Sequence, residues 1–224
     1  MNKTRIMCYG DSNTWGYCAA TGARYEDDQR WCPLLQQLLG EQYTVIEEGL
    51  VGRTTVFNDP LDPTLNGLAH FPTIAMSQAP LDLLTVMLGT NDCKERFSAN
   101  SQNIADGLRL LVNTAKRMDI WRAQPRVLIV APIMIHEAVY QVPRIGLEMG
   151  AGSVEKSRQL PEQMRATARE TGSWFLDSNP YVQPGPADWM HFDAGSHPAL
   201  AKAMAGMVHR IFTHPEQLEQ SWSE

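Results

Sequence analysis

Short apolar runs of strand-like composition alternate along this chain with longer segments in which apolar residues recur at helical spacing. The runs that we predict to be strands are residues 5–9, 43–47, 83–88, 126–130 and 173–177. The segments that we predict to be helices are 31–39, 104–118, 154–170 and 199–212. This order is typical of βαβ crossovers, so it predicts an α/β fold with a five-stranded, mostly parallel sheet that is covered on both faces.

The length and composition fit one folded domain. The chain has 224 residues, of which 43% are hydrophobic and 20% charged, so intrinsic disorder is excluded. We expect a single domain over residues 1–224, with a polar and acidic tail from about residue 214. Two long connections, 50–80 and 133–153, are predicted as loops that either line a site or run over the surface.

Charge, cysteines and histidines exclude several classes of partner. The formal net charge is −6, which offers no basic surface to nucleic acid, and no apolar run reaches the length of a membrane span. Residues 1–8 carry charge but no apolar signal segment, so we expect a soluble, cytoplasmic protein. The four cysteines form no C-x-x-C pair and the six histidines show no H-x-H or H-E-x-x-H spacing. We therefore expect reduced thiols, no metal and no cofactor.

The turns that follow the predicted strands carry the chemically capable residues, and in an open parallel sheet ligands bind at this edge. Ser12 follows the first strand at a predicted helix start. Free N–H groups and the helix dipole favour negative charge there, so Ser12 is a candidate nucleophile. Taken alone, Asp11 and Ser12 are more often an N-cap and a turn residue. Gly10 favours the nucleophile, because it lets a substrate approach the backbone closely.

Asp188 and His191 precede the last predicted helix. A serine hydroxyl is protonated at neutral pH and needs a base, which a carboxylate can hold in one tautomer. An isolated D-x-x-H is also common in surface turns. His197 is a rival base, but Pro198 and the residues after it indicate a helix start. We therefore assign the base to His191 and its orienting acid to Asp188.

Gly52 and Asn91 follow the second and third predicted strands, and both can donate hydrogen bonds to a carbonyl oxygen that gains charge. Gly52 offers an N–H without side-chain obstruction, and Asn91 offers an amide. Taken singly, Gly52 is more often a turn glycine and Asn91 a helix cap. Together, four turns supply a nucleophile, two donors and a base with its acid, which is the set that a hydrolase site requires.

These residues resemble the SGNH (GDSL-type) hydrolases, which are named for the Ser, Gly, Asn and His of four sequence blocks. The chain carries the four blocks in order, as Gly10-Asp11-Ser12, Gly52, Gly89-Thr90-Asn91-Asp92 and Asp188-x-x-His191. Other segments are similar to the bacterial arylesterase and acyltransferase branch: 10–16, 47–50, 53–55, 59–60, 65–67 and 87–92.

The resemblance implies a flavodoxin-like three-layer α/β/α sandwich and a Ser-His-Asp mechanism that acts on short acyl esters. Ser12 would attack the ester carbonyl, His191 would move the proton and Asp188 would orient the ring. The N–H groups of Ser12 and Gly52 and the amide of Asn91 would hold the oxyanion. The resemblance also implies a small-molecule ester substrate, a homo-oligomer, and transfer of the acyl group to alcohols in water.

The chain departs from the family pattern at several positions. Asn13 stands where the first block commonly has leucine, and Trp189 and Met190 place two bulky residues in the last block. The segment 133–153 has no evident counterpart in the branch, so the substrate pockets cannot be transferred from it. We expect Trp15 either to wall the substrate pocket or to pack beneath the first helix.

Two other functions fit parts of the same pattern. A metal-dependent phosphoesterase would place Asp11, Asp92 and His191 around a divalent cation. A non-catalytic flavodoxin-like module would bind a flavin or a protein, but the acidic charge and the lack of a Gly-rich phosphate loop after the first strand argue against it. No G-x-S-x-G elbow surrounds any serine, which argues against the α/β-hydrolase fold.

Overall fold

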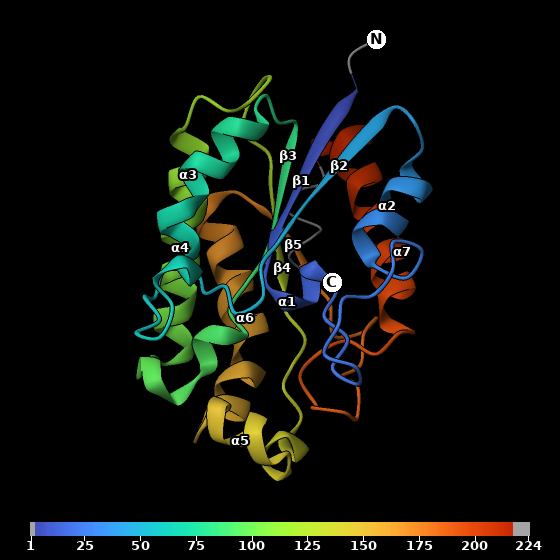
Figure 1. Cartoon of the computed structure of the whole chain (residues 1–224). Helices are drawn as coiled ribbons and strands as arrows, with labels where there is room; N and C mark the ends of the chain where they lie inside the picture. The colour runs from blue at the N-terminus through green and yellow to red at the C-terminus, as the bar shows by residue number, and fades with distance from the viewer. Residues whose placement is uncertain (1–2, 217–224) are drawn as a thin grey trace.

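A single parallel sheet forms the centre of the protein in a computed structural model that describes residues 3–216. Its strands are β1 (Thr4–Gly10), β2 (Tyr43–Gly49), β3 (Leu83–Met87), β4 (Val127–Ala131) and β5 (Trp174–Asp177). They lie in the order β2-β1-β3-β4-β5, and every neighbouring pair is parallel (Figure 1). The predicted five-stranded sheet is confirmed. The chain runs from β1 outward to β2 and returns to the other side of β1 with β3, which makes this the topological switch point.

Three strands end at the same level of the sheet. Gly10 pairs with Gly49 of β2 and with Met87 of β3. The segments that leave these strands therefore start from one edge, although they are far apart in the sequence. This register gathers three turns on a common rim: 11–16, 50–54 and 88–92.

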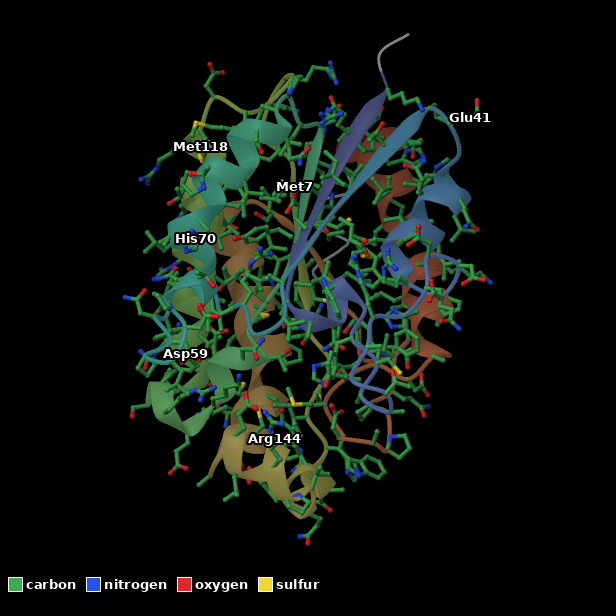
Figure 2. All side chains as sticks on the ribbon, viewed as in Figure 1. Met7, Glu41, Asp59, His70, Met118 and Arg144 are labelled. Atoms are coloured by element: carbon green, nitrogen blue, oxygen red, sulfur yellow. The ribbon has the colours of Figure 1, made fainter. Side chains whose placement is uncertain are left out.

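Helices cover both faces of the sheet, as the α/β/α sandwich requires (Figure 1). One face carries α2 (Trp31–Leu39) and α7 (Ser196–Thr213), and the other carries α3 (Gly67–Gln78), α4 (Ser101–Arg117) and α6 (Ser153–Thr171). Along β1, Ile6 and Cys8 join the core of the first face, whereas Met7 and Tyr9 join that of the second. Figure 2 labels Met7 in this interior. β3 and β4 are buried throughout, which explains their nearly continuous apolar sequences.

The two long connections that we predicted as loops each hold a helix, which corrects that prediction. Residues 50–80 include α3, and residues 133–153 include α5 (Pro143–Met149). α3 has a proline at its centre, Pro72, which removes one helical hydrogen bond and interrupts a sequence pattern that would otherwise indicate a helix. α5 is too short for its apolar residues to show a helical period.

The four predicted helices are present, and three of them begin one to three residues earlier than predicted, at Ser101, Ser153 and Ser196. Short elements shape the sheet rim: α1 (Ser12–Trp15), and the 3₁₀ turns η1 (Pro63–Leu65), η2 (Asn91–Cys93), η3 (Glu95–Phe97) and η4 (Glu137–Gln141). Between residues 3 and 216, no helix combines the length and apolar character needed to cross a membrane. α7 ends at Thr213, and most of the predicted polar tail lies outside the described residues.

Candidate active site

Ser12, His191 and Asp188 meet in one hydrogen-bonded chain, although Ser12 and His191 lie 179 positions apart in the sequence. The Oγ of Ser12 lies 2.8 Å from Nε2 of His191, and the Nδ1 of His191 lies 2.5 Å from Oδ2 of Asp188. All three side chains are buried. A hydroxyl, an imidazole and a carboxylate in this order allow the hydroxyl to lose its proton as it attacks.

Ser12 is held by a tight turn between β1 and α1. Asp11 caps α1 by accepting a hydrogen bond from the Asn13 N–H at 2.9 Å. Gly10 leaves room for this turn, since a Cβ there would lie 2.0 Å from the Thr14 Oγ1. The turn therefore fixes the Ser12 hydroxyl at the rim of the sheet.

The carboxylate of Asp188 organises the loop that carries His191. Its Oδ1 accepts hydrogen bonds from the N–H groups of Met190 at 3.1 Å and of His191 at 3.0 Å, while Oδ2 faces the imidazole. Burial alone would raise the pKa of Asp188, but these hydrogen bonds and the charge of His191 hold that pKa below its ordinary value. Trp189 has a φ of +64°, a left-handed conformation that costs a non-glycine residue about 1–2 kcal/mol. Its N–H donates to the Gly185 carbonyl at 2.8 Å, which helps to hold this conformation.

Asn13 holds the same loop from the side of α1. Its Oδ1 accepts a hydrogen bond from the Phe192 N–H at 2.9 Å, and its Nδ2 donates to the Met190 carbonyl at 3.4 Å. These two contacts flank His191 on both sides. Asn13, which stands where the SGNH pattern commonly has leucine, thus joins the Ser12 turn to the His191 loop.

Gly52 and Asn91 lie beside Ser12 in the lining of one cavity. The Nδ2 of Asn91 donates one hydrogen to the Arg53 carbonyl at 3.1 Å, which leaves its other hydrogen for a ligand. The backbone N–H groups of Ser12 and Gly52 find no acceptor among the hydrogen bonds of residues 3–216. Because Ser12 and Gly52 both line this cavity, their N–H groups are placed to donate to an oxygen that gains negative charge there.

The Gly52 loop is anchored to β1 by the buried Arg53. The Arg53 Nη1 donates to the carbonyls of Gly10, at 2.8 Å, and of Glu48, and its guanidinium lies 4.1 Å from the Tyr9 ring centroid. Gly52 itself has a φ of +86°, which favours glycine. The loop therefore presents its N–H from a fixed position beside Ser12.

Two buried acids support the neighbouring turns. Asp92 Oδ1 accepts hydrogen bonds from the Thr55 N–H at 2.8 Å and the Thr55 hydroxyl at 2.5 Å, which ties the loop after β2 to the turn after β3. Burial raises the pKa of both Asp11 and Asp92 to about 6. In the described part of the chain, no three His, Cys, Asp or Glu side chains gather as a metal site. The geometry therefore gives no support to a cation held by Asp11, Asp92 and His191.

The cavity in front of Ser12 has a volume of about 140 Å³. Trp15, which we expected either in the pocket wall or beneath the first helix, is not among the lining residues of this cavity, so the first alternative is wrong. Trp15 is half-buried, and the guanidinium of Arg24 instead lies over its ring, with the Arg24 Cζ 5.1 Å from the ring centroid. Gly16 ends α1 with a φ of +86°. The next residue, Tyr17, lines the cavity, and its ring centroid lies 4.6 Å from that of His191.

The chain was compared with known families and structures. The model of the GDSL-like Lipase/Acylhydrolase family matches residues 8–215. The chain belongs to this family. The aryl esterase of M. smegmatis is 34% identical, the match covers 92% of this chain and 98% of that chain, and the TM-score is 0.84. A carbohydrate acetylesterase family member from Sinorhizobium meliloti is 36% identical, with 93% and 98% covered and a TM-score of 0.86. A search of curated proteins gives no match.

Membership in the GDSL-like family, together with esterases as structural neighbours, makes this protein a serine esterase that hydrolyses carboxylic esters. The expected SGNH resemblance is thereby confirmed.

The sequence analysis missed an ion pair in the cavity wall of this esterase. Lys94 Nζ lies 2.7 Å from the Glu148 Oε1, and the Lys94 side chain is almost fully buried. Lys94 follows η2, whereas Glu148 belongs to α5, so the pair joins two distant segments. Because α5 was predicted as loop, no sequence signal brought these two charges together.

Proposed function

We propose that Ser12 is the nucleophile of this esterase, that His191 is its general base and that Asp188 orients the imidazole. The 2.8 Å contact between Ser12 Oγ and His191 Nε2 carries the proposal. As Oγ attacks the carbonyl carbon of the ester, its proton passes to Nε2, and the carboxylate 2.5 Å from Nδ1 stabilises the imidazolium that forms.

The attack turns the carbonyl oxygen into an oxyanion. The N–H groups of Ser12 and Gly52 and the Nδ2 of Asn91 would donate to it, and a single such donor is worth about 10²–10³ in rate. Collapse of this intermediate breaks the bond to the alcohol oxygen, and His191 gives that oxygen its proton. The acyl group stays on Ser12 until water, deprotonated by His191, attacks it and the acid leaves.

The substrate is proposed to be a short-chain carboxylic ester of an aryl or alkyl alcohol. The cavity in front of Ser12 measures about 140 Å³. Since a cavity of about 150 Å³ accepts one small ring, an acyl group of only a few carbons fits. The name of one structural neighbour, a carbohydrate acetylesterase family member, supports a small acyl group, and that of the other, an aryl esterase, supports an aryl alcohol.

The nucleophile is tested by labelling and by mutation. A fluorophosphonate should add once to the peptide that contains Ser12, as read by mass spectrometry, and Ser12→Ala should lose both the label and the hydrolysis of p-nitrophenyl acetate. Ser77→Ala, which changes an exposed serine on α3, is the matched control and should keep both. Hydrolysis by folded Ser12→Ala at the wild-type rate would contradict the assignment.

We also propose that the acyl-enzyme can pass its acyl group to an alcohol. The apolar side chains of Val51, Ile145 and Met149 in the cavity lining support this, because they favour the carbon chain of an alcohol over water. With p-nitrophenyl acetate and added ethanol, ethyl acetate should form alongside acetate, as measured by gas chromatography. Acetate alone would contradict acyl transfer.

The remaining proposals concern the state of the protein. A homo-oligomer is supported by Leu38 on α2, which is 56% exposed in a groove beside Leu34 and Ala201, and light scattering would measure its mass. A single folded domain is supported by the one continuous sheet, and limited proteolysis should leave a single core. Cytoplasmic location is supported by four buried, unpaired cysteines, and cell fractionation tests it.

A further inference from the structure

A second hollow adjoins the catalytic cavity. It has a volume of about 590 Å³, and it shares Val51, Gly52, Lys94 and Glu148 with the lining of the smaller cavity. We call it the outer groove. Gly52, which carries one of the proposed oxyanion donors, stands at the junction, so an ester bound at Ser12 can extend into this groove.

The lining of the outer groove holds three cations, Lys94, Arg96 and Arg144, and three carboxylates, Asp59, Asp62 and Glu148. Glu148 lies 2.7 Å from Lys94 Nζ and 3.4 Å from Arg96 Nη2, and Arg96 also lies 3.3 Å from the carboxylate of Asp59. Burial alone would raise the pKa of Glu148, but Lys94, Arg96 and Arg144 hold it below its ordinary value. Lys94 and Arg96 are therefore paired with Glu148 and Asp59, whereas no ion pair among residues 3–216 involves Arg144.

Arg144 is the cation that remains available. It is exposed on α5, lines the outer groove, and makes no hydrogen bond or ion pair with another residue in the range 3–216. Its guanidinium keeps five donors in a planar fork that matches a carboxylate. Figure 2 labels Arg144 on α5 and Asp59 on the segment after β2. The other carboxylate in the lining is Asp62, whose Oδ1 is held by the Thr64 N–H at 2.9 Å and the Thr64 hydroxyl at 2.6 Å.

Apolar side chains accompany these charges in the lining. Leu61 is 77% exposed and Leu147 is 87% exposed, while Val51 at the junction is 40% exposed. Burying such exposed apolar side chains under a ligand would contribute favourable free energy to binding. An organic ligand with an apolar body and a negative charge would cover the leucines and pair with Arg144.

We propose that the outer groove binds the alcohol part of the ester and that Arg144 selects alcohols that carry a carboxylate. This inference rests on the proposed function of Ser12. The small cavity limits the acyl group, and the adjoining outer groove has room for the larger part of the substrate. Attraction between the carboxylate and Arg144 would favour anionic esters over neutral ones of the same size.

The test compares two acetate esters that differ in charge. 4-Acetoxybenzoate carries a carboxylate para to the ester oxygen, and phenyl acetate is its neutral counterpart. The measured quantity is the ratio of their kcat/KM values. Intrinsic reactivity cancels when this ratio is compared between wild type and variants. Arg144→Gln should lower the ratio about three- to fivefold, as expected for a partly exposed ion pair, with phenyl acetate turnover unchanged.

Three further variants and the salt concentration sharpen the result. Arg144→Glu should lower the ratio further, and Asp62→Asn, which removes a repelling charge, should raise it. Arg117→Gln changes an exposed arginine at the end of α4, outside the groove lining, and should leave the ratio unchanged. The preference of the wild type should shrink as ionic strength rises from about 0.05 to about 0.5 M, because salt screens exposed charges.

Two results would overturn the inference. One is a ratio that does not respond to Arg144→Gln. The other is an equal loss of both activities, which indicates a structural role. If the wild type fails to hydrolyse phenyl acetate, the proposed function fails instead, and binding still reports on the groove. Calorimetry with 4-hydroxybenzoate should then show weaker binding to Arg144→Gln than to wild type, and equal affinities would refute the groove assignment.

Discussion

Replacing Asn13 with leucine, the residue that the family commonly has there, tests how firmly the His191 loop must be held. The change removes the hydrogen bonds to the Phe192 N–H at 2.9 Å and to the Met190 carbonyl at 3.4 Å. Leaving a buried donor without a partner costs about 1–3 kcal/mol, so we expect stability to fall by about 2 kcal/mol.

The larger effect is expected in catalysis. His191 would keep Asp188 but lose the contacts on both sides of its own position, and a shift of about 1 Å in a reacting group can lower the rate about 100-fold. We therefore expect Asn13→Leu to lower kcat for p-nitrophenyl acetate about 10- to 100-fold, with KM nearly constant. Urea unfolding measures the loss of stability, and titration of active sites with a fluorophosphonate gives kcat per folded site.

Asn100→Ala is the matched control for this experiment. Asn100 caps α4 by accepting a hydrogen bond from the Asn103 N–H at 2.8 Å, and it is not among the residues that line the cavity in front of Ser12. Loss of this cap should lower stability by about 1 kcal/mol without lowering kcat. If Asn13→Leu loses stability but keeps kcat per titrated site within a factor of about two, Asn13 only stabilises the fold. That outcome would refute the reasoning.

Three further changes have defined outcomes. Asn91→Ala should lower kcat about 100-fold with little change in KM, and an effect on KM alone would contradict its role as an oxyanion donor. Gly52→Ala should lower the free energy of unfolding, as measured in urea, by about 1 kcal/mol or more, and it should lower kcat. The reason is that the φ of Gly52 is +86° and the new Cβ would lie 2.9 Å from Leu65 Cδ1. Burial lowers the pKa of His197 to about 4, and neither of its ring nitrogens has a partner in the described structure. As pH falls, His197 therefore becomes protonated in the unfolded chain before it does so in the folded protein. Up to about 3 kcal/mol of stability is lost between about pH 6.5 and pH 4. His197→Leu should remove this loss, so urea midpoints at about pH 7.5 and 5 should differ less than in wild type.

The meeting of Ser12 and Asn91 in the candidate site could be predicted because parallel strands end at a shared edge. Ser12 follows β1 directly, and Asn91 follows β3 closely, so the topology brings both residues to the same rim. His191 and Asp188 lie in a loop whose path is fixed by Asn13 and by the unusual backbone of Trp189. These contacts depend on tertiary structure and could not be read from the sequence. Only the spacing of the D-x-x-H motif indicated that Asp188 pairs with His191.

The pocket wall could not be predicted in the same way. Trp15 and Tyr17 differ by two positions, and only the left-handed turn at Gly16 decides which aromatic ring meets His191. The charges of the outer groove come from segments that are far apart in the sequence. Pairs such as Arg96 and Asp59 leave no periodic signal in a sequence.

The distance along the chain between Ser12 and His191 has a consequence during synthesis. At about 5–20 residues per second, a ribosome needs about 10–40 s to add the 179 positions that separate the two. Throughout that interval Ser12 lacks the imidazole of His191, which we propose as its base. The growing polypeptide therefore cannot cleave esters, and competence arises only once the last strand and the loop beyond it have been made.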